Sequence, residues 1–169
     1  RNAHRSCCGS GTGEQNVHPR IALWRSVHPG KYAAGGADFL PPRGKMGLCG
    51  RLCLRPAGNG HRHENRVRRI TQNYPYLVYE DDATGQVLGY AYLDCYSERK
   101  AYRFTCDLSI YLAMDARGRG IGRMLYEAIE AEAYRRGFYT VVAIVTSENT
   151  ASMAFHEAMG FVKMADFEN

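Results

Sequence analysis

Long apolar runs are missing from this chain of 169 residues. A helix needs about 20 consecutive apolar residues to cross a bilayer, and no stretch approaches that length. No charged segment followed by an apolar one opens the sequence in the manner of a secretory signal. We therefore expect a cytoplasmic protein with no membrane partner. The six cysteines do not require a disulfide framework in a chain of this size, and Cys95 and Cys106 are predicted to be small buried side chains within strands.

Acidic residues are scarce in the first third of the chain. Residues 1–62 contain 10 lysines and arginines against 2 acidic residues, whereas the remainder contains 12 against 15, so the net charge of +5 arises in the first third. The same segment holds 11 of the 18 glycines and 5 of the 6 prolines. Beyond the short run 21–24 it shows no sustained period of 2 or 3.6 residues and no clear strand or helix face. We therefore divide the chain into an atypical basic segment, 1–62, and a folded domain, 63–169.

Three hypotheses compete for this basic segment. Clustered arginine is the usual footprint of a disordered arm that binds nucleic acid or acidic surfaces. A metal site is the second hypothesis, but adjacent cysteines are a poor pair of ligands, so we expect no metal. The third and favoured hypothesis is that the segment is out of frame or fragmentary, and nucleic acid is then an improbable partner. The candidate metal ligands are Cys7, Cys8, Cys49 and Cys53 with His61 or His63.

A glycine turn stands between an apolar run, 108–113, and a segment with helical periodicity, 123–136. A strand that breaks into such a turn and then a helix leaves backbone N–H groups unpaired, with the positive end of the helix dipole behind them. This arrangement is typical of a site for the phosphates of a ligand. Gly120 and Gly122 flank Ile121 and let the backbone approach the ligand, and Arg117 and Arg119 add positive charge.

Two alternatives remain for this turn, a purely structural turn and another kind of nucleotide site. A dinucleotide-binding fingerprint would need a third glycine, and Leu125 stands in its place. The stretch resembles the Arg/Gln-x-x-Gly-x-Gly/Ala motif of the GNAT acetyltransferases. About 30 residues later, the stretch 147–161 is similar to a second motif of that family, Asn-x-x-Ser-x-x-x-His-Glu-x-x-Gly-Phe. Within it, Ser147 or Asn149 can cap a short helix and Gly160 can end it.

The resemblance covers residues 64–163, and the upstream segments 74–78, 87–92 and 101–111 look like the subgroup of phosphinothricin and amino-acid N-acetyltransferases. It implies an α/β (α+β) three-layer fold around a mixed, mostly antiparallel sheet with a splayed parallel pair. We expect this fold to be incomplete at both ends, with room for one strand after Phe161 and an open sheet edge if the first third supplies no strand. The predicted elements are helix 64–73, strands 76–80, 86–94 and 103–114, helix 120–136, strand 138–145 and helix 150–159.

The resemblance also implies roles for individual residues. A backbone N–H within Tyr111, Leu112 and Ala113 is expected to bond the thioester oxygen of acetyl-coenzyme A, and the backbone of Leu112 and Met114 is expected to contact its pantetheine arm. Asn149 and Ser152 are further candidates for cofactor contacts, although each is also a plausible helix cap or surface residue. Together with the residues of the glycine turn, they form the predicted cofactor site.

Two residues are predicted to be catalytic. Asp107 occupies the position of the general base in phosphinothricin-type enzymes, and a carboxylate inside an apolar strand is costly to bury unless it faces a wet pocket. His156 is expected to protonate the departing thiolate. A solvated strand residue and a structural histidine are the respective alternatives. Aromatic residues at alternating strand positions could wall the acceptor pocket, namely Tyr90, Tyr92, Tyr102 and Phe104.

These predictions define an acetyl-coenzyme A-dependent N-acetyltransferase that acts on the amine of a small amino acid or analogue by direct attack. A homodimer is possible. The alternative functions are an incomplete or inactive coenzyme A-binding domain and a nucleic-acid-binding module with a basic arm.

Overall fold

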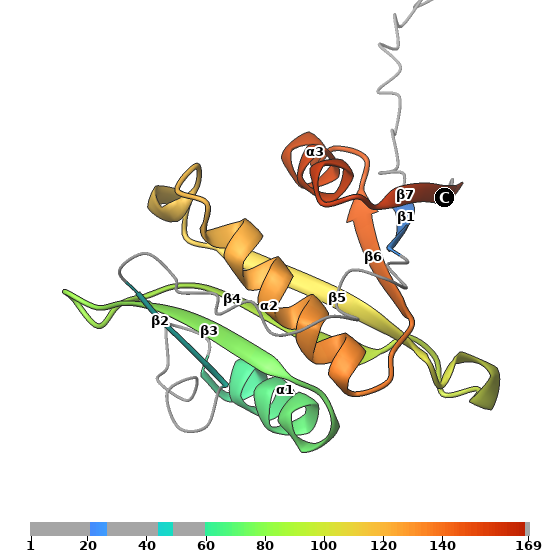
Figure 1. The fold of residues 1–169 in the computed structure, drawn as a ribbon, viewed down its shortest axis with the longest axis horizontal. Helices are drawn as coiled ribbons and strands as arrows, with labels where there is room; N and C mark the ends of the chain where they lie inside the picture. Colours follow the sequence, from blue (N-terminus) through green and yellow to red (C-terminus); the bar gives the residue numbers. More distant parts are fainter. Residues whose placement is uncertain (1–20, 27–43, 49–59, 168–169) are drawn as a thin grey trace, which may run out of the picture.

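A single mixed sheet organises the molecule. The structure, a computed structural model, describes residues 21–26, 44–48 and 60–167. Within these residues the strands are ordered β2-β3-β4-β5-β6-β1-β7 (Figure 1). The elements in chain order are β1 (Ile21–Ser26), β2 (Gly44–Leu48), α1 (Gly60–Asn73), β3 (Tyr76–Asp81), β4 (Val87–Cys95), β5 (Thr105–Leu112), α2 (Ile121–Arg135), β6 (Thr140–Thr146), α3 (Thr150–Ala158) and β7 (Val162–Phe167).

The sheet divides where β5 and β6 meet. These two strands form its parallel pair, and they are paired only at Thr105 with Thr140, Cys106 with Val141, and Asp107 with Val142. Beyond that point β5 continues to Leu112 against β4, while β6 continues to Thr146 against β1. The strands therefore diverge, and Figure 1 shows β6 turning away from β5 toward α3. The splayed pair expected from the sequence is confirmed.

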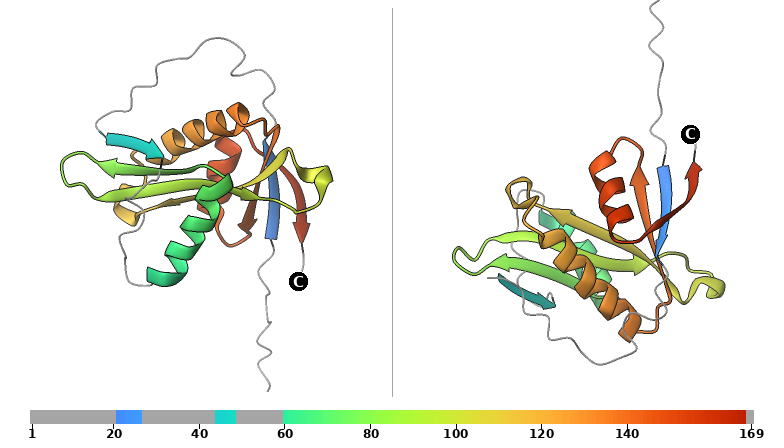
Figure 2. Two further views of the ribbon diagram at one scale, coloured as in Figure 1. Left: turned by 90° about the horizontal axis from the view of Figure 1, so that it is seen from below. Right: turned by 45° about the horizontal axis from the view of Figure 1, so that its top comes forward.

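Two helices cover opposite faces of the sheet, α2 on one side and α1 on the other (Figure 2). The apolar stripe predicted for α2 is buried, with Ile121, Leu125 and Ile129 each at most 2% exposed within the larger core. On the other face, α1 packs Val67 and Ile70 against tyrosines of β3 and β4. The mixed three-layer architecture is thus as predicted.

Local sequence signals locate most element boundaries correctly. The turn between β3 and β4 is closed by Asp81, whose Oδ1 accepts hydrogen bonds from the backbone N–H groups of Ala83 and Thr84 at 3.1 and 3.0 Å. Gly85 follows in a left-handed conformation, with φ of 66°. One burial prediction is wrong. Cys106 is buried as expected, but Cys95 is exposed because it ends β4 at the margin of the sheet.

Two strands come from the basic first third, where the sequence pattern showed no clear strand. Strand β1 lies between β6 and β7 and is antiparallel to both, and its Trp24 is 2% exposed in the main core. Strand β2 pairs with β3 at the other edge of the sheet. An open sheet edge is expected only if the first third supplies no strand, and this condition does not hold because the first third supplies β1 and β2. Main-chain pairing does not require alternating side chains, which explains why the pattern missed β2.

Candidate active site

The glycine turn opens α2 as the sequence predicts. Gly118 and Gly120 both have left-handed backbones, with φ of 73° and 80°. Gly120 is the N-cap and offers no side-chain cap, and the first in-helix hydrogen bond runs from the Met124 N–H to the Gly120 carbonyl at 3.1 Å. The N–H groups of residues 121–123 therefore have no acceptor within the helix. A Cβ on Gly118 or Gly120 would meet no atom of the described segments within 4 Å, so these segments leave the space in front of the turn open. These features fit an anionic phosphate group.

A pocket of about 380 Å³ lies beside this turn, between the end of β5 and α3. It brings together six of the predicted site residues, Leu112, Arg117, Gly122, Asn149, Ser152 and His156. It also contains Ile110, Tyr111, Gly118, Ala151 and Phe155, which the sequence analysis did not select as site residues.

At Gly122, helix α2 packs closely against β5 and α3 beside the pocket. A Cβ at this position would lie 3.2 Å from Leu112 Cδ1 on β5 and 3.3 Å from Phe155 Cε2 on α3. The predicted need for glycine here is therefore explained by packing of α2 against β5 and α3. Phe155 could have been found from its place on the helix face between Ser152 and His156, since residues three and four apart share a face.

The remaining predicted cofactor residues flank the pocket rather than line it. The Ala113 N–H donates to the Leu88 carbonyl at 2.9 Å, so it is already engaged within the sheet. Met114 follows in a short 3-10 turn with its side chain 74% exposed. The Arg119 Nη2 lies 3.9 Å from the Asp81 Oδ2 at the end of β3, and Ile121 is buried in the core.

Helix α3 fixes the orientation of His156. The Asn149 side chain caps this helix by accepting a hydrogen bond from the Ser152 N–H at 3.1 Å, as predicted for a cap. The Nδ1 of His156 lies 2.7 Å from the Ser152 carbonyl oxygen, so Nδ1 carries the proton and donates it. Burial lowers the pKa of His156, which favours the neutral ring. Its Nε2 therefore presents a lone pair rather than a proton.

Asp107 lies at the last paired position of β5 and β6, where the sheet divides. Its Oδ1 atom is buried and has no hydrogen-bond partner among the residues that the structure describes. Burial, and secondly the charge of Asp94, raise the pKa of Asp107 to about 6. This carboxyl is not among the residues that line the pocket, but it shares a strand face with Tyr111, which does line it.

Four tyrosines form a stacked layer on the α1 face of β3, β4 and β5. Tyr90 stacks on Tyr76 and on Tyr111 with ring centroids 5.6 and 5.0 Å apart, and Tyr76 stacks on Tyr92 at 5.2 Å. The layer runs from the buried Tyr76 to the half-exposed Tyr111, and so reaches the pocket.

The other two aromatic residues proposed as pocket walls lie elsewhere. Tyr102 packs edge-on against Tyr96, and Phe104 packs against Tyr139, both at the turn before β5. Each is more than 40% exposed, at 41% and 43%. Strand β5 begins only at Thr105, so both residues lie in the turn before it and neither lines the pocket described above.

The splayed parallel pair of the sheet and the glycine turn that opens α2 are features of an acetyltransferase-like fold, and comparison with known proteins assigns the family. Residues 51–161 match the model of the acetyltransferase (GNAT) family. The chain therefore belongs to the GNAT family of acetyltransferases. Among the described residues, no helix is long and apolar enough to cross a membrane.

Several characterised proteins are similar to this chain. Phosphinothricin N-acetyltransferase from Alcaligenes faecalis is 47% identical over 90 residues, which cover 53% of this chain and 45% of that protein. The L-methionine sulfoximine/L-methionine sulfone acetyltransferase from Pseudomonas aeruginosa is 39% identical over 93 residues, covering 55% and 54%. The chain thus spans about half the length of these relatives. The crystal structure of a phosphinothricin acetyltransferase from Sinorhizobium meliloti with acetyl-coenzyme A has a TM-score of 0.66 at 29% identity, covering 73% and 77%.

Proposed function

We propose that this protein transfers an acetyl group from acetyl-coenzyme A to the amino group of a small amino acid or analogue by direct attack. The observation that carries the proposal is the pocket that joins the glycine turn of α2 to the end of the splayed strand β5. The names of the relatives, which include phosphinothricin and methionine sulfoximine acetyltransferases, support a small amino acid-like acceptor. We also propose a cytoplasmic location, a homodimer as a possible assembly, and no role for a metal.

The first turn of α2 would hold the pyrophosphate of the cosubstrate. The free N–H groups of residues 121–123 and the open space at Gly120 suit phosphate oxygens, and Arg117 in the pocket adds a positive charge. The backbone of Leu112 and Met114 would contact the pantetheine arm, with Asn149 and Ser152 on the facing helix. When bound, acetyl-coenzyme A supplies an acetyl thioester that is activated toward amines.

Asp107 is the proposed general base. Its buried Oδ1 has no partner in the described structure, so it is free to accept a proton. A pKa of about 6 leaves the carboxyl mainly ionised at neutral pH yet basic enough to take a proton from an ammonium group, which is the range that favours base catalysis. Removing that proton frees the nitrogen lone pair that direct attack requires. A bridging water would extend the reach of this short side chain.

His156 is the second proposed catalytic residue, with a constraint that the sequence did not reveal. Because Nδ1–H is bound to the Ser152 carbonyl and burial favours the neutral ring, Nε2 accepts a proton before it can give one to a leaving thiolate. His156 would therefore act as a proton relay at the end of the pocket. Its Nε2 would first take up a proton and would then give that proton to the leaving thiolate.

The competing hypothesis is an incomplete or inactive GNAT domain that binds coenzyme A. A nucleic-acid-binding function would reside in the basic first third, and most of that segment, including Cys7, Cys8, Cys49 and Cys53, lies outside the described residues.

Calorimetry and a thiol-release assay separate these functions. The full chain should bind acetyl-coenzyme A but not a short DNA duplex, and should release free thiol only when phosphinothricin or methionine sulfone is added. Asp107→Asn should bind the cosubstrate equally well and turn over on the order of a hundredfold more slowly. Binding without amine-dependent thiol release would favour the inactive domain, and binding of DNA alone would refute the acetyltransferase.

A further inference from the structure

An ion pair joins α1 to the sheet close to the proposed base. The Arg69 guanidinium donates to both carboxylate oxygens of Asp94, with Nη1 3.1 Å from Oδ1 and Nη2 2.5 Å from Oδ2. This two-point contact fixes the orientation of the carboxylate. The Asp94 Oδ1 also accepts a hydrogen bond from the Cys95 N–H at 2.8 Å, so Asp94 is held from two sides.

Asp94 stands directly opposite Asp107 in the pairing of β4 with β5. Residues that oppose each other in an antiparallel pair point to the same face, with Cβ atoms about 5 Å apart. Two carboxyl groups therefore sit side by side at the point where the sheet divides. The charge of Asp94 disfavours ionisation of Asp107, and this effect is second only to burial.

Among the described residues around Asp107, Asp94 is the charged group that faces it. On the β6 side the paired residue is Val142, which has no charge. On its own strand, burial raises the pKa of the neighbouring Cys106 to about 12, so that thiol stays neutral. From α1, Arg69 acts through its contact with Asp94. The electrostatic environment of Asp107 is thus set by one negative group and by the arginine that neutralises it.

We propose that the Arg69–Asp94 ion pair is a positioning pair that controls how firmly the Asp107 carboxyl holds its proton. Arginine cancels part of the field of Asp94, so the pair as a whole disfavours the Asp107 carboxylate less than Asp94 alone would. Through Asp107 the pair would set the lower end of the pH range of acetyl transfer, and this consequence rests on the proposed function.

The test is an NMR titration of the Asp107 side-chain carboxyl in the full chain without any ligand. Asp94→Asn keeps an oxygen for the Cys95 N–H but loses the charge, and it should lower the pKa of Asp107 by roughly half to one unit. Arg69→Gln leaves the Asp94 charge uncompensated and should raise that pKa by a similar amount. Arg69→Lys retains the charge and should leave the pKa near that of the wild type.

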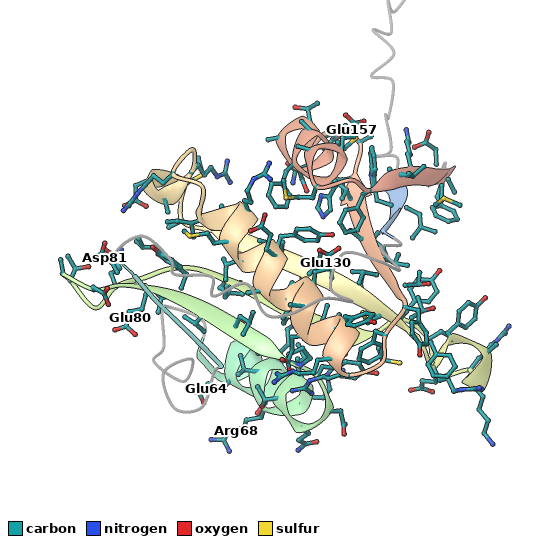
Figure 3. The ribbon with its side chains drawn as sticks, in the orientation of Figure 1. Glu64, Arg68, Glu80, Asp81, Glu130 and Glu157 are labelled. Carbon is teal, nitrogen blue, oxygen red and sulfur yellow. The ribbon has the colours of Figure 1, made fainter. Side chains whose placement is uncertain are left out.

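Two control variants change the net charge equally but lie elsewhere. Arg68→Gln removes the neighbouring arginine on α1, whose side chain extends away from the sheet (Figure 3), and Glu98→Gln removes an exposed acid before β5. Neither should move the Asp107 titration by more than a small fraction of a unit, because exposed charges are screened unless they contact the group directly, as Arg69 contacts Asp94.

If the pKa of Asp107 falls in Asp94→Asn and rises in Arg69→Gln, the proposal is supported. General loosening of the structure would instead move the pKa of Asp107 in the same direction in both variants. Shifts of the same sign, or no shift in either variant, would overturn it. The titration reads the carboxyl in the absence of acetyl transfer, so an inactive protein would refute the proposed function and leave this result standing. In an active protein, the pH at which kcat/KM falls on the acid side should move down in Asp94→Asn and up in Arg69→Gln, together with the pKa of Asp107.

Discussion

Replacing Asp107 with asparagine should stabilise the protein at neutral pH, although it removes the proposed base. Burial and the neighbouring Asp94 raise the pKa of Asp107 from 3.8 to about 6 in the folded state. A carboxyl whose pKa is raised by folding binds its proton more tightly in the native state than in the unfolded chain. Its ionisation therefore opposes folding, and stability is lost as the pH rises from the unfolded pKa through the folded one. Asparagine has a similar shape and cannot ionise.

The size of the effect follows from these two pKa values. A shift of about two units corresponds to about 3 kcal/mol in the free energy of unfolding above about pH 7. At about pH 4.5 the penalty is only about 1 kcal/mol, because the native carboxyl is protonated there. The advantage of Asp107→Asn should therefore grow by about 2 kcal/mol between about pH 4.5 and pH 7.5. Wild type and Asp107→Asn both carry a polar atom at the buried Oδ1 position. The cost of desolvating that atom therefore largely cancels when the two proteins are compared.

Urea unfolding at the two pH values measures this difference. Trp24 is the only tryptophan and is buried in the core, so its fluorescence reports unfolding. A difference of about 2 kcal/mol moves the urea midpoint by about 1 M. Glu98→Gln serves as the control, since its exposed charge should give the same offset at both pH values. Equal pH dependence in wild type and Asp107→Asn would show that Asp107 is solvated and would refute the reasoning.

Three further predictions concern the pocket and its supports. Gly120→Val should abolish binding of acetyl-coenzyme A in calorimetry. A branched side chain disfavours a φ of 80° and would fill the space in front of the N–H groups of residues 121–123. Unchanged affinity would contradict a phosphate site at this turn. Gly89→Ala should destabilise the protein by about 1–3 kcal/mol in urea, since its Cβ would lie 2.9 Å from the Tyr111 carbonyl oxygen and 2.5 Å from Leu112 Cδ2. Gly47→Ala, with open space around it, is the matched control and should cost nothing, and equal stability of the two variants would contradict the close approach. The His156 ring should titrate below 6.5 by NMR with its neutral-form proton on Nδ1, and a titration above 6.5 would contradict the buried, carbonyl-bound ring.

Features set by neighbouring residues along the chain could be predicted from the sequence. The glycine turn before α2, the Asn149 cap and the left-handed Gly160 at the end of α3 all occur as expected. The apolar stripe of α2 is buried because its spacing leaves one face for the sheet. Backbone conformation, capping and helical periodicity depend on residues within a few positions of each other, so a sequence displays them directly.

Pairings between distant segments could not be predicted in this way. Strand β1 lies between β6 and β7 although more than 100 residues separate it from them in the chain, and β2 carries no alternating pattern. The exposure of Cys95 and the removal of Tyr102 and Phe104 from the pocket depend on where strands end, which composition does not determine. Hydrogen bonds between main chains are made by any residue type, so they leave little trace in the sequence.

The residues of the proposed site could be chosen from the sequence, but most of the distances between them are set by the tertiary structure. The glycine turn, Asp107 and His156 could be selected by motif and position alone. The tautomer of His156 depends on a contact with the Ser152 carbonyl one turn away in α3, whereas only the register of β4 against β5 places Asp94 beside Asp107. Proton affinity depends on burial and on charges a few ångströms away, and these distances exist only once strands far apart in sequence have paired.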